Sequence, residues 1–218
     1  MDEIIVRLAR TLACKARLRL LACLVSDGEK PPTALARKMR MTPSALSAHL
    51  AKLTTAGLIQ RRRSGAWSYC IASSPYGPST LSGKTANWIG QLFSSSAKAT
   101  KDCGLHEVRN SSSAAEDGKL RELIFESATA FTDLRRLQIL RRLLRAGTAS
   151  GPSLCRDLKM SQFALRRHCD KLLRRGYLTH LAEPEPCYRL ADTFKTPIHA
   201  QLWQIVRENL RTEKLRTS

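Results

Sequence analysis

The sequence predicts a mostly α-helical protein with small β-hairpin wings, arranged as two tandem winged helix-turn-helix domains. Three observations lead to this fold class. Residues 41–57 carry the start and stop signals of one amphipathic helix, and a short helical segment precedes them. A basic hairpin pattern follows directly after this helix. The whole pattern then returns in the second half of the chain.

The first elements of the chain are expected to be helices. Residues 3–13 carry an apolar face at helical spacing, and residues 15–25 form a second helical pattern that ends before Gly28. Pro31-Pro32 breaks that helix, and a short helical segment follows over residues 34–39. A short helix, a turn of about four residues and a longer helix make a helix-turn-helix.

The longer helix, residues 41–57, has two contrasting faces. Thr42 is a good N-cap, Pro43 suits the first helical position, and Gly57 suits a left-handed C-terminal cap. A buried stripe is expected from Leu46, Leu50 and Leu53. The other face is small, polar or basic, as a helix that enters a DNA groove needs to be. Candidate DNA-contacting residues there are Pro43, Ser44, Ser47, Ala48, His49 and Lys52. Taken alone, the stretch fits an ordinary surface helix equally well.

The segment after Gly57 changes from helical to alternating spacing. Residues 58–63 read as a strand, Ser64-Gly65 as a turn, and residues 67–71 as the return strand. Beside a recognition helix, the wing arginines are well placed to neutralise phosphates: Arg61, Arg62 and Arg63. Residues 81–93 are expected to form a closing helix. We expect domains at residues 1–93 and 119–218, joined by a linker over residues 94–118 that is rich in Ser, Ala and charge.

Residues 8–72 resemble the ArsR/SmtB winged-helix repressors of bacteria. The resemblance is carried by Arg17-Leu18-Arg19-Leu20-Leu21, Ser44-Ala45-Leu46-Ser47-Ala48-His49-Leu50, Ala56-Gly57-Leu58-Ile59 and Arg62-Arg63-Ser64-Gly65-Ala66-Trp67-Ser68-Tyr69. It implies a repressor that a metal or ligand releases from DNA, with dimers held by the first and last helices. For His49 and His168, which share the family's Ser-x-His-Leu position, it favours capping or phosphate contact over metal binding.

The second half of the chain repeats the first without a gap. Position 168 minus position 49 gives an offset of 119, and this offset aligns residues 17–72 with residues 136–191. The register keeps a glycine at each helix end and a histidine in each recognition helix, and such agreement is hard to obtain by chance. The sequence therefore predicts an internal duplication, with residues 193–212 as the second closing helix.

The two copies differ on the surfaces expected to face DNA. The second recognition helix is expected over residues 161–175, with Ser161 as its cap. Its outward face carries Gln162, Arg166, Arg167 and Lys171. Gln can pair with adenine and Arg with guanine, although phosphate contact alone explains Arg167 and Lys171 as well. The second wing, residues 182–186, carries two glutamates that phosphate would repel, so it is expected to turn away from DNA.

The composition limits the partners of this chain. Its formal net charge is +19 and its isoelectric point is near 10.3, which favours a polyanionic partner. The absence of a long apolar run and of a signal-peptide pattern favours a cytoplasmic protein with no membrane partner. The sequence shows neither a nucleophile motif nor a Gly-rich phosphate loop, so we expect no enzyme activity, no cofactor and no metal site.

Seven cysteines without a CxxC pair fit a reducing compartment. A thiol sensor would need two or three thiolates held together. Cys14 could approach Cys103 if the first and last helices pack as they do in the family that the chain resembles. The alternative is that these thiols are small buried hydrophobes, as free cysteines commonly are.

These observations together predict a sequence-specific transcriptional regulator that binds double-stranded DNA with two winged helices, either as an intramolecular pseudo-dimer or as a homodimer. Because the recognition helices differ, its operator is expected to be an imperfect palindrome. One alternative is a non-specific nucleic-acid-binding protein. Another is a protein-interaction module with a degenerate second domain, which the acidic second wing favours.

Overall fold

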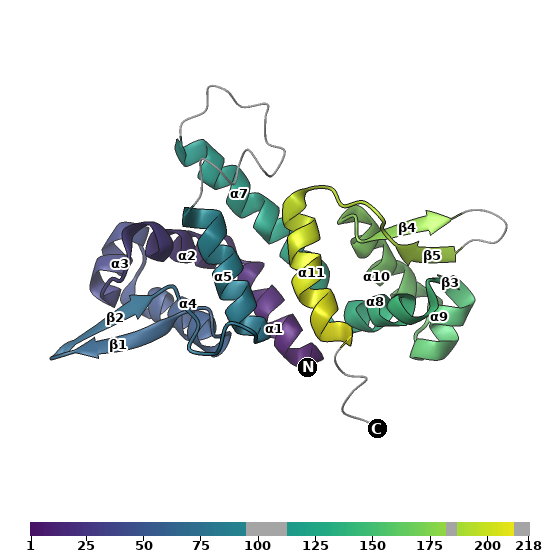
Figure 1. Cartoon of the computed structure of the whole chain (residues 1–218), viewed down its shortest axis with the longest axis horizontal. Helices are drawn as coiled ribbons and strands as arrows, with labels where there is room; N and C mark the ends of the chain where they lie inside the picture. Colours follow the sequence, from purple (N-terminus) through teal and green to yellow (C-terminus); the bar gives the residue numbers. More distant parts are fainter. Residues whose placement is uncertain (95–112, 182–186, 212–218) are drawn as a thin grey trace. The chain divides into compact units, whose positions relative to one another are not determined.

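The computed structural model describes residues 1–94, 113–181 and 187–211. They are mostly helical, with small antiparallel hairpins, and this confirms the predicted fold class of a winged helix-turn-helix protein (Figure 1). The chain forms two compact units. The N-terminal unit comprises residues 11–125, and the C-terminal unit comprises residues 1–10 together with residues 126–218. In the ranges that the structure describes, no helix is long and apolar enough to cross a membrane.

The N-terminal unit contains a three-helix arrangement followed by a wing. Its elements are α2 (Lys15–Asp27), α3 (Pro32–Met39), α4 (Pro43–Thr55), β1 (Gln60–Ser64), β2 (Trp67–Ile71) and α5 (Leu81–Ser94). Helix α4 packs against α3 and α2, and α5 packs against α2. Leucines at helical spacing fill the space between these helices because they face inward on α2 and α4. They include Leu18, Leu21, Leu46, Leu50 and Leu53, each at most 2% exposed.

The C-terminal unit repeats this order of elements and adds a strand. It contains η1 (Thr129–Phe131), α8 (Leu134–Ala146), β3 (Thr148–Ser150), α9 (Gly151–Leu158), α10 (Gln162–Arg174), β4 (Leu178–Leu181), β5 (Cys187–Leu190) and α11 (Pro197–Arg211). The strands form one antiparallel sheet in the order β3-β5-β4. Its core is aromatic: Phe131 lies 4.7 Å from Tyr177 and 6.2 Å from Trp203 between ring centroids.

Helices α8, α9 and α10 have the bounds of α2, α3 and α4 shifted by the same 119 positions, since 134 minus 15, 151 minus 32 and 162 minus 43 all give that value. Local contacts repeat as well. Arg17 Nε donates to Thr11 O at 2.7 Å, and the equivalent Arg136 Nε donates to Ala130 O at 2.7 Å. The non-glycine residues with positive φ are equivalent too, Arg40 at 54° and Lys159 at 50°.

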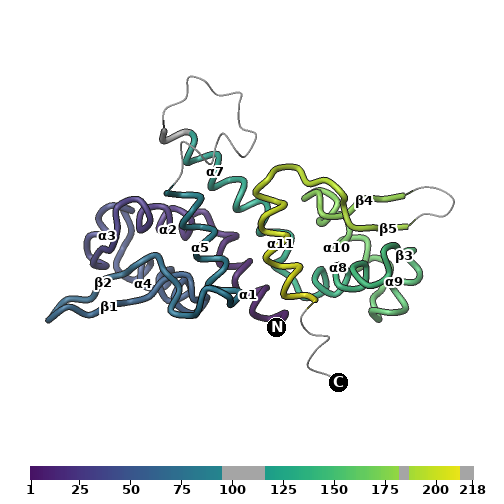
Figure 2. The backbone as a smooth tube through the Cα atoms, viewed as in Figure 1, coloured from purple at the N-terminus to yellow at the C-terminus, as the bar shows by residue number. Residues whose placement is uncertain are grey.

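Each compact unit includes a helix from the other half of the chain. Helix α1 (Asp2–Leu12) places its first residues in the C-terminal unit, where the Asp2 carboxylate pairs with Arg141 and Arg10 Nε donates to Thr132 O at 2.9 Å. Helix α7 (Ser113–Ala128) belongs mainly to the N-terminal unit, where Glu122 pairs with Lys15 at 2.7 Å. The tube in Figure 2 follows both helices along the chain. The expected domains at 1–93 and 119–218 stay a prediction.

Two segments differ from the sequence expectation. Residues 113–118, expected to be part of the linker, form the first turns of α7, because alanines and charged residues sustain a helix as readily as they form a loop. Strand β3 was not expected, since three residues are too short to show alternation. The acidic wing segment 182–186 lies outside the described residues.

Candidate nucleic-acid interface

Helix α4 begins where the sequence signals place it. The Thr42 hydroxyl accepts a hydrogen bond from the backbone N–H of Ala45 at 3.2 Å, and Pro43 occupies the first turn. The preceding turn reverses the chain through Arg40, whose positive φ lets Met41 N donate to Ala36 O at 3.0 Å. This cap and this turn fix where α4 begins and how the chain turns between α3 and α4.

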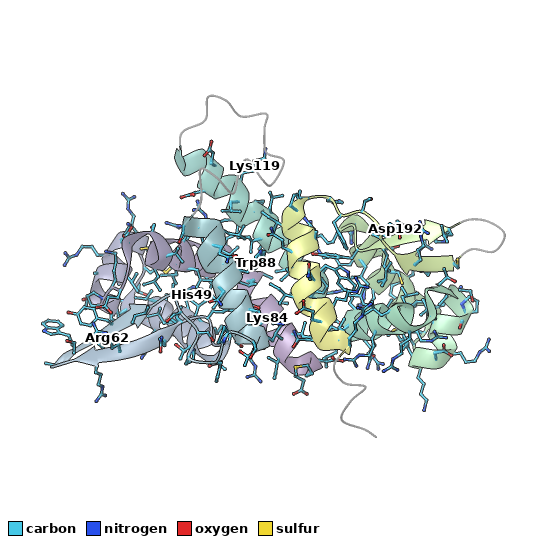
Figure 3. All side chains as sticks on the ribbon, viewed as in Figure 1. His49, Arg62, Lys84, Trp88, Lys119 and Asp192 are labelled. Carbon is cyan, nitrogen blue, oxygen red and sulfur yellow. The ribbon has the colours of Figure 1, made fainter. Side chains whose placement is uncertain are left out.

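The outward face of α4 is open to solvent. Its exposed residues are Pro43, Ser44, Ser47, Ala48 and Lys52. His49 is only partly exposed, and Figure 3 labels it on this helix. Burial lowers the pKa of His49, and the nearby charges of Arg17 and Lys52 lower it further. The neutral form of this imidazole is therefore favoured, and it can contact DNA as a hydrogen-bonding group.

The wing separates its three arginines onto two faces. In the hairpin register Arg61 lies opposite Cys70 and Arg63 opposite Ser68, whereas Arg62 lies opposite Tyr69. Successive side chains of a strand point to opposite faces, so Arg61 and Arg63 share one face and Arg62 takes the other. Arg62 donates to both carboxylate oxygens of Glu29, with Nε 3.1 Å from Oε2. Figure 3 labels Arg62 on this wing.

The Glu29 contact changes the electrostatic role of Arg62. The hydrogen bond from Arg62 lowers the pKa of the Glu29 carboxyl, so this carboxylate stays ionised at neutral pH. The Arg62 guanidinium also lies 5.9 Å from the centroid of the Tyr69 ring. The charge of Arg62 is thus neutralised within the N-terminal unit, and the face with Arg61 and Arg63 is the better candidate for phosphate contact.

Helix α10 presents a larger and more basic outward face than α4. Ser161 caps it by accepting from Ala164 N at 3.2 Å, as expected. Among the candidate residues, Gln162, Arg166 and Arg167 are exposed and Lys171 is partly exposed. Burial and the adjacent Arg175 and Arg174 lower the pKa of Lys171.

For His168 the resemblance favoured capping or phosphate contact over metal binding, and its burial does not fit a phosphate contact. Its side chain is buried in the C-terminal unit, with the residue only 5% exposed. Its Nδ1 lies 3.9 Å from an Asp133 carboxylate oxygen, which is beyond hydrogen-bond distance. Burial lowers the pKa of His168, so the ring stays neutral near pH 7. His49 and His168 occupy equivalent helical positions, but His49 is partly exposed and His168 is buried.

The thiol-sensor hypothesis rests on Cys14 and Cys103, and Cys103 lies outside the described residues. Cys14 is partly exposed at the start of α2. Burial raises the pKa of the Cys169 thiol to about 12, which suits the expected role as a core hydrophobe. Within the described ranges no group of three metal-ligating side chains comes together.

The high exposure of two aromatic side chains and one ion pair of the wing were not predicted from the sequence. Phe163 on α10 is 79% exposed and Trp67 at the tip of the wing is 63% exposed. Both lie beside candidate DNA contacts, and an exposed aromatic ring can contact thymine methyl groups or stack on a base. The outward position of Phe163 on the helical wheel could have revealed it. No sequence signal links Glu29 to Arg62, since the two are separated by 33 positions.

The comparison with protein families agrees with this geometry. A family model described as a helix-turn-helix domain matches residues 12–62, which run from the last residue of α1 to the middle of β1. No curated protein matches the chain. The chain thus carries a helix-turn-helix domain, which at this general level supports a DNA-binding regulator and a role in transcription regulation.

Proposed function

We propose that this chain is a cytoplasmic, ArsR-like transcriptional repressor that reads a roughly palindromic operator with two winged helices. The observation that supports the proposal most is the recurrence of the helix-turn-helix in both compact units, each with an exposed and capped second helix. The net charge of +19 supplies the attraction to DNA that such a protein needs.

The proposal assigns two kinds of contact. Base edges in the major groove are contacted by Ser44 and Ser47 from α4 and by Gln162 and Arg166 from α10. The phosphate backbone is contacted by the remaining candidates, which set position rather than sequence preference. They are Pro43, Ala48, His49, Lys52, Arg61, Arg62, Arg63, Arg167 and Lys171, with Arg62 contributing least because Glu29 already binds it.

Substitution of Arg166 tests the assignment to base reading. If Arg166 reads a guanine, Arg166→Ala should cost about 1–3 kcal/mol of binding free energy on the selected operator and relax the preference at one base pair. Operator DNA is first selected from a random pool, and both proteins are then titrated with that operator and with random DNA. Arg167→Ala is the matched control, because it removes the same charge from the neighbouring position. Equal losses on operator and random DNA would mean that Arg166 only holds a phosphate.

The chain is also proposed to be a tandem duplication that does the work of a dimer. Each compact unit holds a first helix from the opposite half, which supports pairing of the halves within one chain. Covalent linkage raises the effective concentration of the second half into the millimolar range, roughly, and so favours pairing within the chain. Light scattering on the operator complex should give one 24.3 kDa chain per operator. Two chains on one short operator would contradict the pseudo-dimer.

A protein-interaction role for the C-terminal unit is the second candidate. Phe163 is 79% exposed on its recognition helix, and large exposed aromatic side chains are enriched at protein interfaces. In that case Phe163→Ala would leave operator affinity unchanged, whereas DNA reading by α10 predicts a loss.

A further inference from the structure

A pocket of about 320 Å³ lies between α8 and α9 in the C-terminal unit. Figure 1 shows these two helices next to each other, beside strand β3. One wall is a stripe of α8 at i, i+3, i+4 and i+7 spacing, formed by Gln138, Arg141, Arg142 and Arg145. The other wall is the end of α9 and the following turn, with Asp157, Leu158 and Lys159.

The lining of this pocket is strongly positive. Four cationic side chains and one carboxylate give a net charge of 4 minus 1, or +3. Asp157 Oδ2 accepts from Arg142 Nε at 2.7 Å, and Asp2 pairs with Arg141 from outside the lining. When the Asp2 carboxylate is subtracted as well, a net charge of +2 remains around the pocket. Bringing cations together in a concave site focuses a field that attracts an anion.

The hydrogen-bonding groups in this pocket are mostly donors. Guanidinium and ammonium groups donate and never accept. Arg135 donates to the Gln138 Oε1 at 3.2 Å, so the amide nitrogen of Gln138 is left as a further donor. Arg135 also donates to Leu158 O at 3.3 Å, which ties the two walls together. A ligand that satisfies such a lining must be rich in acceptors and negatively charged.

The first copy differs from the second in where its cations stand. Arg19, Lys38 and Arg40 take the positions equivalent to Gln138, Asp157 and Lys159, whereas the three arginines of α8 have no charged counterpart. Subtracting 119 from positions 141, 142 and 145 gives Ala22, Cys23 and Ser26, which are small and uncharged. The helices themselves have equivalent bounds, so the fold does not require arginines at these positions. The row of three arginines on the α8 wall is therefore specific to the second copy and is not a structural requirement of the repeat.

We propose that this pocket binds a phosphoryl group, either of a free phosphorylated small molecule or of the DNA backbone. Arginine matches phosphate with paired hydrogen bonds, and Lys159 adds a point charge to the lining. The volume is at the lower end of the range for small-molecule sites, and Leu158 is the apolar side chain of the lining. The site therefore recognises the negative charge of its ligand, and the phosphoryl group contributes most of the binding free energy.

The first arm of the test measures binding of inorganic pyrophosphate to the full chain by titration calorimetry, without divalent metal ions. Arg145→Gln/Lys159→Gln should weaken this binding about tenfold or more, because it removes two charge-assisted contacts. Arg19→Gln/Arg40→Gln is the matched control. It removes the same net charge from exposed residues, at positions equivalent to Gln138 and Lys159 of the pocket, and should leave the affinity unchanged. This arm does not depend on the proposed DNA-binding function.

The second arm measures the salt dependence of DNA binding for the same two variants. If the phosphoryl group belongs to DNA, pyrophosphate binds poorly and the slope of log K against log salt falls by up to about 1.8 in the pocket variant alone. If it belongs to a free ligand, pyrophosphate binding is lost selectively and the two slopes agree. Equal behaviour of the pocket variant and its control in both arms would overturn the proposal.

Discussion

The division of the wing arginines between two faces makes a quantitative prediction about DNA affinity. Arg61 and Arg63 share the face that is open for phosphate, whereas Arg62 is bound by Glu29 on the other face. We therefore expect Arg61→Gln/Arg63→Gln to weaken binding to every DNA sequence. The variant Glu29→Gln/Arg62→Gln removes an internally compensated pair, and it should leave binding nearly unchanged.

The size of the effect follows from counterion release. Each phosphate contact contributes about 0.9 to the slope of log K against log salt, so loss of Arg61 and Arg63 lowers the slope by up to about 1.8. A rise from 50 to 200 mM salt is a fourfold change, whose logarithm is about 0.6. Over this range the variant should therefore lose roughly twelvefold less of its DNA affinity than the original chain does. The paired variant should change the slope by less than about 0.3, because its net charge is that of the original chain.

Fluorescence anisotropy with random DNA at four salt concentrations measures these slopes. The single variant Glu29→Gln adds a sharper check, because it releases the Arg62 guanidinium and should raise the slope by up to about 0.9. Circular dichroism spectra confirm that each variant is folded. A fall in slope of the Glu29→Gln/Arg62→Gln protein as large as that of Arg61→Gln/Arg63→Gln would refute the argument from the two faces.

Two further predictions concern stability. Burial lowers the pKa of His199 to about 4, below the usual value near 6.5, so the unfolded chain takes up this proton first as the pH falls. The stabilisation is complete well above pH 6.5, and about 1–2 kcal/mol is lost between pH 6.5 and 5, which urea unfolding should detect and His199→Asn should remove. In α5, Gly83→Ala would place its Cβ 2.2 Å from Gly77 O, whereas Gly90 has open space. Thermal unfolding should show a loss of about 1–3 kcal/mol for Gly83→Ala and a gain of about 0.5–1 kcal/mol for Gly90→Ala.

Local signals predicted the helix-turn-helix well because they act over a few residues. Thr42 and Ser161 cap the helices as expected, and Gly57 and Gly176 have φ of +68° and +73° after them. Helical spacing identified the buried leucines for the same reason. The offset of 119 allowed the helices of the second half to be predicted from those of the first. The bounds of α8, α9 and α10 agree with this offset.

Features that depend on distant residues could not be predicted in this way. The sequence groups Arg61, Arg62 and Arg63 together, and the Glu29 contact that separates Arg62 comes from a residue 33 positions away. For His168 the family position favoured capping or phosphate contact, yet the packing of the C-terminal unit buries its side chain. The candidate phosphoryl-binding pocket is formed by α8 together with the end of α9. No short sequence motif describes a pocket whose two walls come from separate helices.

The sharing of first helices has a consequence for the order in which the chain folds during synthesis. The N-terminal unit is continuous over residues 11–125, so the ribosome delivers all of its parts in one stretch. Residues 1–10 are made before this stretch, but their unit also needs residues 126–218. At about 5–20 residues per second, the 93 residues from 126 to 218 (218 minus 125) take roughly 5–20 s.

Three apolar side chains of α1 are buried in the folded protein: Ile5, Val6 and Leu8. During that interval the other residues of their unit have not yet been synthesised. A nascent chain that stops within the second half leaves this face of α1 uncovered, and a second nascent chain presents the same face nearby. Exposed apolar helices of this kind are a route to misassembly between chains. The N-terminal unit can thus form before the second half is made, whereas the unit that contains residues 1–10 depends on translation of residues 126–218.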